Sequence, residues 1–253
     1  MVRTAKPPFP INLIWNVKAF YVAFIMVMIL SLAAVGLAPG LGGTSGGGGG
    51  APIVEDSPVP GETPIGLLTF SKAEDTIDTS KGHKAVITTD RGPIVIALNP
   101  DTPQAANSFA FLAGHNFYDG LEFFWVLPGF DAQAGDPTCE GSGEYSCAGT
   151  AGPGYTLPRE GDSSDPGLWS VIVPVTSQGS DQVHGSQFVI ALTDDGEFEG
   201  SVVGEVIEGR EILESLEQRV PCFGAQPSES NPCQTPDELP PPLIIEDVVV
   251  QPA

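Results

Sequence analysis

The sequence predicts a mainly β fold, a closed β-barrel capped by two helices, preceded by a transmembrane helix near the N-terminus. Two observations indicate the barrel. Many short β-rich segments are separated by Gly, Pro and Asp, and only two segments of the domain place apolar residues at helical spacing. The membrane helix is indicated by 20 uncharged, mostly apolar residues from Ala19 to Ala38. The 253 residues suit one domain of about 150 to 200 residues with appendages.

The run 19–38 is long enough to cross a bilayer, because a rise of about 1.5 Å per residue gives about 30 Å. Signal peptides usually have shorter apolar regions, but small residues at its end leave cleavage open as an alternative. Arg3, Lys6 and Lys18 precede or border the run, whereas all 32 acidic residues follow it. The positive-inside rule therefore predicts a single-pass cell-membrane protein with residues 1–18 in the cytoplasm and its C-terminal domain outside.

The segment between the membrane run and the domain has the composition of a linker. Residues 39–51 are almost entirely small and Gly-rich, and the rest of the predicted linker, 39–82, is rich in Pro and acids. The folded domain is predicted to span 83–253. Because the formal net charge is -22, its surface should repel phosphates, and we expect no nucleic-acid partner.

Within the domain, two β-rich segments, 84–88 and 92–98, are joined by a turn. A helix is expected from the Thr-Pro pair at 102–103 to a stop at Gly114. A second helix is expected over 210–218, where Ile and Leu share one face, and a last strand over 243–250.

Four cysteines follow the membrane run, and they allow three pairings. Closure of short loops favours a Cys139–Cys147 and a Cys222–Cys233 disulfide, which would suit an oxidising compartment. The alternative is a zinc site, but the CxxC spacing typical of structural zinc is absent. We therefore predict two disulfides and no metal.

Five motifs then occur in an order and at a spacing that resembles the cyclophilin family. The resemblance covers residues 84–250, apart from an insertion over 222–242. It implies an eight-stranded antiparallel barrel and peptidyl-prolyl cis-trans isomerase activity. The motifs are Phe-Tyr-Asp-Gly-Leu at 117–121, Val-Leu-Pro-Gly-Phe at 126–130, Gln-Ala-Gly-Asp-Pro at 133–137, Gly-Ser-Gln-Phe-Val-Ile at 185–190 and Val-Gly-Glu-Val-Ile-Glu-Gly at 203–209.

The activity that this resemblance implies needs neither a cofactor nor a metal, because no covalent bond is broken. The barrier of about 18–20 kcal/mol arises from the partial double-bond character of the peptide C–N bond. An apolar pocket that holds the proline ring, and a positive donor near the prolyl nitrogen, would stabilise the twisted transition state.

Matching this sequence to the family motifs assigns seven site residues. Trp125 and Gln133 fall at the catalytic positions, and Gln133 would be a donor that faces the substrate. The other five fall at positions that contact the proline ring or the peptide backbone. They are Phe130, Gln178, Gln187, Val189 and Phe198.

Two departures from the family pattern predict weak catalysis. Phe124-Trp125 replaces a His-Arg pair, so an uncharged N–H stands at the position of the catalytic arginine. Asp131 replaces an apolar methionine. Strand alternation places Trp125 with Phe123 on the substrate face and Phe124 in the core. Loss of one preorganised donor costs about 10²–10³ in rate. We therefore expect a weak isomerase for unfolded exported proteins or, as the alternative, a non-catalytic module that binds Pro-containing peptides.

Overall fold

The structure is a computed structural model that describes residues 68–139, 147, 149–161, 166–223, 225, 227–228 and 232–253. The predicted cytoplasmic segment 1–18 and transmembrane run 19–38 lie outside the described residues. Within the described part of the chain, no helix is both long and apolar enough to cross a membrane. The membrane helix therefore stays a prediction from sequence.

The described chain forms ten strands, two α-helices and one 3₁₀ helix. The helices are α2 (Pro103–Ala113), α3 (Arg210–Glu214) and η1 (Pro236–Glu238). The strands are β1 (His83–Thr89), β2 (Gly92–Leu98), β3 (Trp125–Leu127), β4 (Asp131–Ala134), β5 (Thr156–Pro158), β6 (Ser170–Pro174), β7 (Gln182–His184), β8 (Phe188–Ala191), β9 (Gly200–Glu208) and β10 (Ile245–Pro252).

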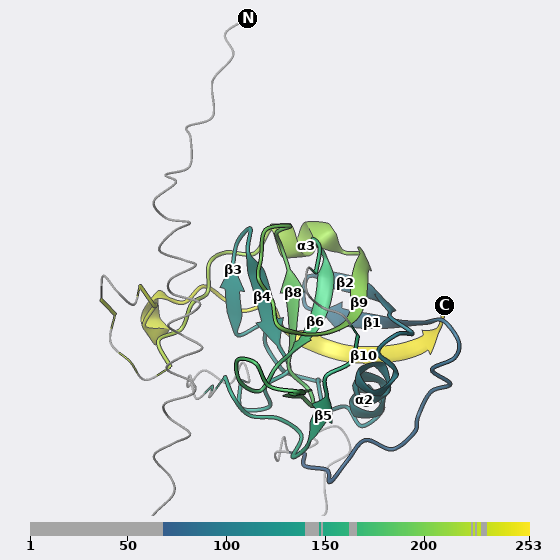
Figure 1. Cartoon of the computed structure of the whole chain (residues 1–253). Helices are drawn as coiled ribbons and strands as arrows, with labels where there is room; N and C mark the ends of the chain where they lie inside the picture. The colour runs from purple at the N-terminus through teal and green to yellow at the C-terminus, as the bar shows by residue number, and fades with distance from the viewer. Residues whose placement is uncertain are drawn as a thin grey trace, which may run out of the picture. The chain divides into compact units, whose positions relative to one another are not determined.

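Eight strands form one antiparallel, curled sheet in the order β10-β1-β2-β9-β6-β8-β4-β3, and β5 pairs with β7 separately (Figure 1). The eight antiparallel strands are as predicted, but the prediction of a closed barrel is wrong, because β3 and β10 are the two edges of the sheet. The edges approach only where the segment before β3 meets residues at the start of β10 and just before it. There, Phe123 N–H donates to Leu243 O (2.9 Å) and Ile245 N–H to Leu121 O (2.9 Å). The sheet is thus a half-barrel.

One hydrophobic core joins the sheet to the two helices, which lie at opposite ends of it (Figure 1). Phe109 and Leu112 of α2 and Leu213 of α3 belong to the core cluster. On β4 the alternation of small apolar and polar residues sends Ala132 and Ala134 into this core. Asp131 and Gln133 therefore project from the opposite face of the sheet, which we call the outer face.

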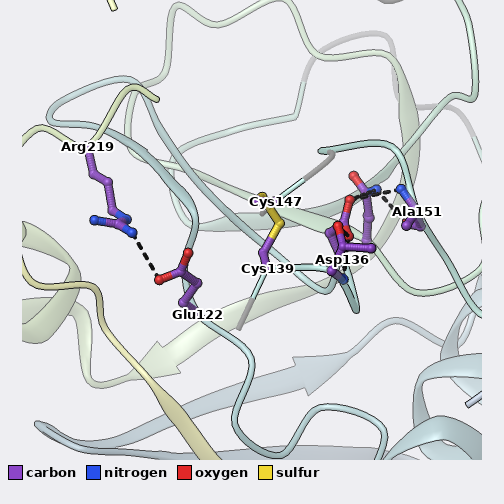
Figure 2. The surroundings of a disulfide bond; sticks show 8 residues. Glu122, Asp136, Cys139, Cys147, Ala151 and Arg219 are labelled. Carbon is purple, nitrogen blue, oxygen red and sulfur yellow. Dashed lines mark hydrogen bonds and ion pairs between the residues drawn. A yellow bond between two sulfur atoms is a disulfide. The ribbon is translucent and has the colours of Figure 1, made fainter. Parts of the chain in front are cut away.

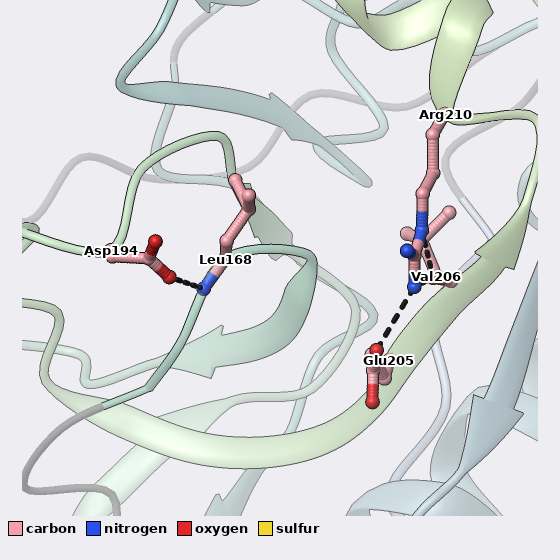
Figure 3. Close-up of polar contacts among 5 residues, drawn as sticks. All are labelled: Leu168, Asp194, Glu205, Val206 and Arg210. Carbon is pink, nitrogen blue, oxygen red and sulfur yellow. Dashed lines mark hydrogen bonds and ion pairs between the residues drawn. The ribbon is translucent and has the colours of Figure 1, made fainter.

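The first helix has the predicted bounds, but the second is shorter than predicted. Helix α3 ends at Glu214, whereas apolar spacing extended it to 218. The reason lies in tertiary pairing: Arg219 N–H donates to Val126 O (2.9 Å) and Val126 N–H to Arg219 O (2.8 Å). This pair of bonds requires an extended backbone near Arg219. At the start of α3, Arg210 folds back onto Val206 O and Glu205 (Figure 3).

Residues 68–82, which composition assigned to the linker, pack against α2. The ring of Phe70 lies 5.0 Å from that of Phe111, and Phe70 N–H donates to Pro153 O (2.7 Å). The side chain of Asn107 accepts from Thr76 N–H (2.8 Å) as well. The folded unit begins about 15 residues before β1, with Leu67 at its boundary.

Candidate functional site

Four side chains form a row across the outer face of the sheet. Trp125 on β3 pairs with Gln133 on β4, Gln133 pairs with Val189 on β8, and Val189 pairs with Ile172 on β6. Directly paired residues of antiparallel strands project from the same face. The sheet therefore brings together three of the seven predicted site residues.

Asp131 lies beside this row and connects two of its members. Its side chain is fully buried. Trp125 Nε1–H donates to Asp131 Oδ1 (3.0 Å), and Gln133 Nε2–H donates to Asp131 Oδ2 (2.7 Å). Burial raises the pKa of Asp131 to about 7, although the hydrogen bonds from Gln133 and Trp125 act to lower it. The indole N–H of Trp125 and one N–H of the Gln133 amide are thus engaged by one carboxyl group.

The indole of Trp125 is covered by an aromatic ring from the insertion. The ring of Phe223 is stacked on it, with centroids 6.4 Å apart and planes 9° from parallel. Phe223 also contacts Phe124 edge-on at 6.3 Å. Gly149 leaves room for this ring, since a Cβ at that position would lie 3.0 Å from Phe223 Cε1. As a result, Trp125 is only 2% exposed.

This arrangement corrects the predicted sides of Phe123 and Phe124. Phe123 belongs to the core cluster and packs edge-on against Phe188 at 5.9 Å. Phe124, which alternation assigned to the core, contacts Phe223 instead. Alternation fails here because β3 begins only at Trp125, so residues 123–125 are not one regular strand.

Two aromatic rings from the predicted proline pocket, those of Phe130 and Phe198, contact each other. Their centroids lie 5.4 Å apart, with the planes at 40°. Phe198 is buried, whereas Phe130, in the turn between β3 and β4, is half-buried. Val189 is also buried, beneath the outer face. In the free protein Phe130 and Gln133 are therefore the more accessible members of this group.

Gln187 is occupied by the structure of a neighbouring loop. Its Nε2–H donates to Ala151 O (2.7 Å) and to Asp136 Oδ2 (3.3 Å), and Ala151 N–H donates to the same Oδ2 (2.8 Å). Figure 2 shows Asp136 and Ala151 of this network near the Cys139–Cys147 disulfide. Burial raises the pKa of Asp136, against hydrogen bonds from Thr138 and the backbone. In the free protein Gln187 thus stabilises the loop that follows β4.

Gln178 lies in an exposed turn between β6 and β7, outside the row that Trp125, Gln133 and Val189 form. The turn is tied to the loop that carries Phe198, because Gly179 N–H donates to Glu199 Oε2 (3.0 Å). This contact indicates that the turn and the loop border one another.

Both predicted disulfides, Cys139–Cys147 and Cys222–Cys233, are present, so none of the four cysteines is free. The second closes the loop that carries Phe223. Sequence reasoning missed Phe223 as a member of the site. An aromatic residue next to a cysteine in an otherwise polar insertion was its only signal, and that signal did not give its position.

Comparison with known proteins identifies the family. The profile of the cyclophilin type peptidyl-prolyl cis-trans isomerases matches residues 84–236. A peptidyl-prolyl cis-trans isomerase of Helicobacter pylori is 32% identical over 159 residues, which are 60% of this chain and 90% of the relative. Peptidyl-prolyl cis-trans isomerase B of Bacillus subtilis is 32% identical over 130 residues, 50% of this chain and 85% of that protein.

A solved structure supports the same fold. The crystal structure of a cyclophilin type peptidyl-prolyl cis-trans isomerase from Cryptosporidium parvum superposes with a TM-score of 0.51 at 22% identity. The match covers 68% of this chain and 99% of that one. With the curled eight-stranded sheet and the order of the motifs, these matches lead to one conclusion: the chain belongs to the cyclophilin-type peptidyl-prolyl cis-trans isomerase family.

Proposed function

We propose that this protein is a slow peptidyl-prolyl cis-trans isomerase that acts on Pro-containing segments of exported proteins. The observation that carries the reduced rate is the engagement of Trp125 and Gln133 by Asp131. Catalysis of prolyl rotation relies on donors that are already aimed at the twisted peptide. Here two candidate donors point at a protein carboxyl group, and the indole N–H carries no charge.

We also propose that the domain works on the outer side of a cell membrane, anchored by residues 19–38. The charge asymmetry around this run supports that orientation. The disulfides support it as well, because such bonds persist in oxidising compartments. In such a place, slow prolyl isomerisation would limit the folding of newly exported chains.

The same observation favours a second function, that of a module which binds Pro-containing peptides without catalysis. Phe130 and Gln133 remain partly accessible and could hold an extended peptide. Binding needs only surface complementarity, whereas catalysis needs interactions that are stronger in the transition state. A peptide that binds with no acceleration of its isomerisation would identify this function.

An isomerase assay on a peptide with one Ala-Pro bond separates the two functions. We expect the full-length protein to have a kcat/KM about 10²–10³ below that of a family member with the arginine, since one preorganised donor is lost. Trp125→Arg alone should recover little, because the new guanidinium would pair with Asp131. Trp125→Arg combined with Asp131→Met should raise kcat/KM by a similar factor.

The matched control is Trp125→Phe combined with Asp131→Met. This variant also removes the indole and the carboxylate, but it introduces no positive charge. If the rise in kcat/KM comes from the guanidinium, this control should show no rise. A wild-type rate equal to that of an arginine-bearing cyclophilin would contradict the proposal of slow catalysis.

A further inference from the structure

The carboxyl group of Asp131 accepts hydrogen bonds from two side chains and has no access to solvent. Trp125 Nε1–H reaches one oxygen at 3.0 Å, and Gln133 Nε2–H reaches the other at 2.7 Å. The register explains this, because Asp131 lies two residues before Gln133 on β4, and Gln133 is paired with Trp125. All three side chains therefore meet on the outer face.

The ionisation of Asp131 restricts how the Gln133 amide can be oriented. An ionised carboxylate only accepts hydrogen bonds, whereas an amide has a donating NH₂ and an accepting oxygen at its two corners. Gln133 must then turn Nε2 toward Asp131, and Oε1 is the corner left to face elsewhere. Gln133 is half-buried on the outer face, so a peptide bound there would meet the Oε1 corner, while both N–H groups of Nε2 lie at the corner that Asp131 holds.

We propose that Asp131 is a positioning residue that decides whether Gln133 presents an acceptor or a donor to a bound peptide. The inference rests on the proposed function, because it takes Gln133 to contact the peptide. With Asp131 ionised, the outward Oε1 suits a peptide N–H. It does not suit the carbonyl groups that flank a proline, which has no N–H of its own.

A proton on Asp131 reverses this orientation. The protonated group has one O–H donor and one carbonyl oxygen. Trp125 Nε1–H keeps the carbonyl oxygen, and the new O–H donates to Gln133 Oε1. Gln133 Nε2–H then turns outward, toward the position of a peptide carbonyl. One buried proton thus exchanges an acceptor for a donor without displacement of the backbone.

Protonation of Asp131 falls in a pH range in which the protein can be studied. Burial raises the pKa of Asp131 to about 7, opposed by the two hydrogen bonds. Strands β3 and β8, which flank β4, contain no titratable side chain. The loop after β8 carries four carboxylates: Asp194, Asp195, Glu197 and Glu199. Donation to a peptide carbonyl is therefore favoured below about pH 7 and lost above it.

The test uses the full-length protein and an acetylated Ala-Pro amide peptide, which has no titratable group. Two quantities are followed from pH 5.5 to 8.5: the peptide Kd, and the NMR resonances of the Gln133 side-chain amide, assigned by their loss in Gln133→Ala. We expect the wild-type Kd to fall about tenfold toward pH 5.5, the effect of one hydrogen bond. The amide resonances should shift over the same range.

Asp131→Asn is the decisive variant, because it has the same shape and mimics the protonated state. Its Oδ1 can accept from Trp125 while its Nδ2–H donates to Gln133 Oε1. We expect it to bind the peptide at every pH as tightly as the wild type does at pH 5.5. Gln133→Ala should bind more weakly at low pH and lose the pH dependence.

The outcomes separate this inference from the proposed function. If Asp131→Asn or Gln133→Ala keeps the wild-type pH dependence, Asp131 does not position Gln133. If the peptide binds but the Gln133 amide resonances stay constant with pH, the inference is again overturned. If those resonances shift in the wild type and not in Asp131→Asn, Asp131 does position Gln133. Absence of peptide binding at any pH would then overturn the proposed function alone.

Discussion

Glu122 and Arg219 form a buried ion pair that joins the segment before β3 to the segment after α3. Arg219 Nη2 lies 3.0 Å from Glu122 Oε2, and Arg219 Nη1–H donates to Pro240 O (2.6 Å). The two side chains are only 7% and 3% exposed. Glu122→Ala would leave a buried guanidinium without its counter-charge. We expect it to lower the free energy of unfolding by about 3–5 kcal/mol in urea denaturation.

The chain offers a control at its surface. Arg210 and Glu205 form an ion pair at 3.0 Å, but these side chains are 39% and 60% exposed (Figure 3). Glu205→Ala should cost less than about 1 kcal/mol, because water screens the pair. Equal losses in Glu122→Ala and Glu205→Ala would show that burial does not set the strength of the first pair.

At the scale of single residues, the sequence revealed the two replacements at the family positions but not the hydrogen bond that joins them. The replacements at Trp125 and Asp131 could be read directly from the motif. That the indole donates to this carboxyl depends on the β3–β4 register, which pairs Trp125 with Gln133 and Leu127 with Asp131. A one-residue slip would send these side chains to opposite faces, and no local signal fixes the register.

At the scale of elements, the insertion is the feature that most changes the site. Its disulfide closes a loop between Cys222 and Cys233. Beside the disulfide, Gln234 N–H donates to Val220 O (2.7 Å), and Gln234 Oε1 accepts from Val220 N–H (2.8 Å). Phe223 has a φ of 45°, a left-handed conformation that costs a residue with a side chain about 1–2 kcal/mol. The closed loop thus holds Phe223 on Trp125 despite this cost.

We predict that Phe223→Ala exposes Trp125 to solvent. Loss of the stacked ring removes about 0.5–1.5 kcal/mol of aromatic contact in addition to its buried area. The Trp125 contribution to fluorescence, obtained by subtraction of a Trp125→Phe background, should shift to longer wavelength and be quenched more strongly by acrylamide.

Phe223→Leu is the control for this prediction, since it keeps an apolar side chain over the indole and should retain most of the protection. Replacement of both Cys222 and Cys233 by Ser should give an intermediate exposure, because the loop is no longer closed while Phe223 is kept. If Phe223→Ala leaves the Trp125 emission unchanged, the loop does not cover Trp125 in solution.

The elements that the sequence predicted well are those whose signals are local. Helix α2 begins at the proline of the Thr-Pro pair and ends before Gly114, and β1 and β2 flank their predicted turn. The failures depend on distant partners. Helix α3 is shortened by the pairing of Arg219 with Val126. The sheet stays open because β3 and β10 do not pair with each other, and residues 121–123 bond to residues 243–245 instead. Apolar spacing contains no information about such partners.

At the scale of the whole molecule, family likeness assigned the residues of the candidate site but not the contacts that they make. Val189, Gln133 and Trp125 lie in one row across the outer face. The donors of Gln187 are engaged by the loop next to the Cys139–Cys147 disulfide, and Phe198 is buried against Phe130. A motif reports which residues are present. It does not report which hydrogen bonds they already make within the free protein.

The distribution of charge along the whole chain leads to the last prediction, that residues 19–38 hold the protein in a membrane. Arginines at Ile25 and Leu30 should release the protein into the soluble fraction, because each charge near the centre of a membrane helix costs about 2.5–3.5 kcal/mol. Arginines at Gly43 and Gly48, in the linker, are the matched control and should leave the protein with the membranes. Protease added to intact cells should remove the domain from outside if the orientation is as proposed. A mature chain that begins near residue 39 by mass spectrometry would show instead that the run is a cleaved signal, and the domain would then be exported without an anchor.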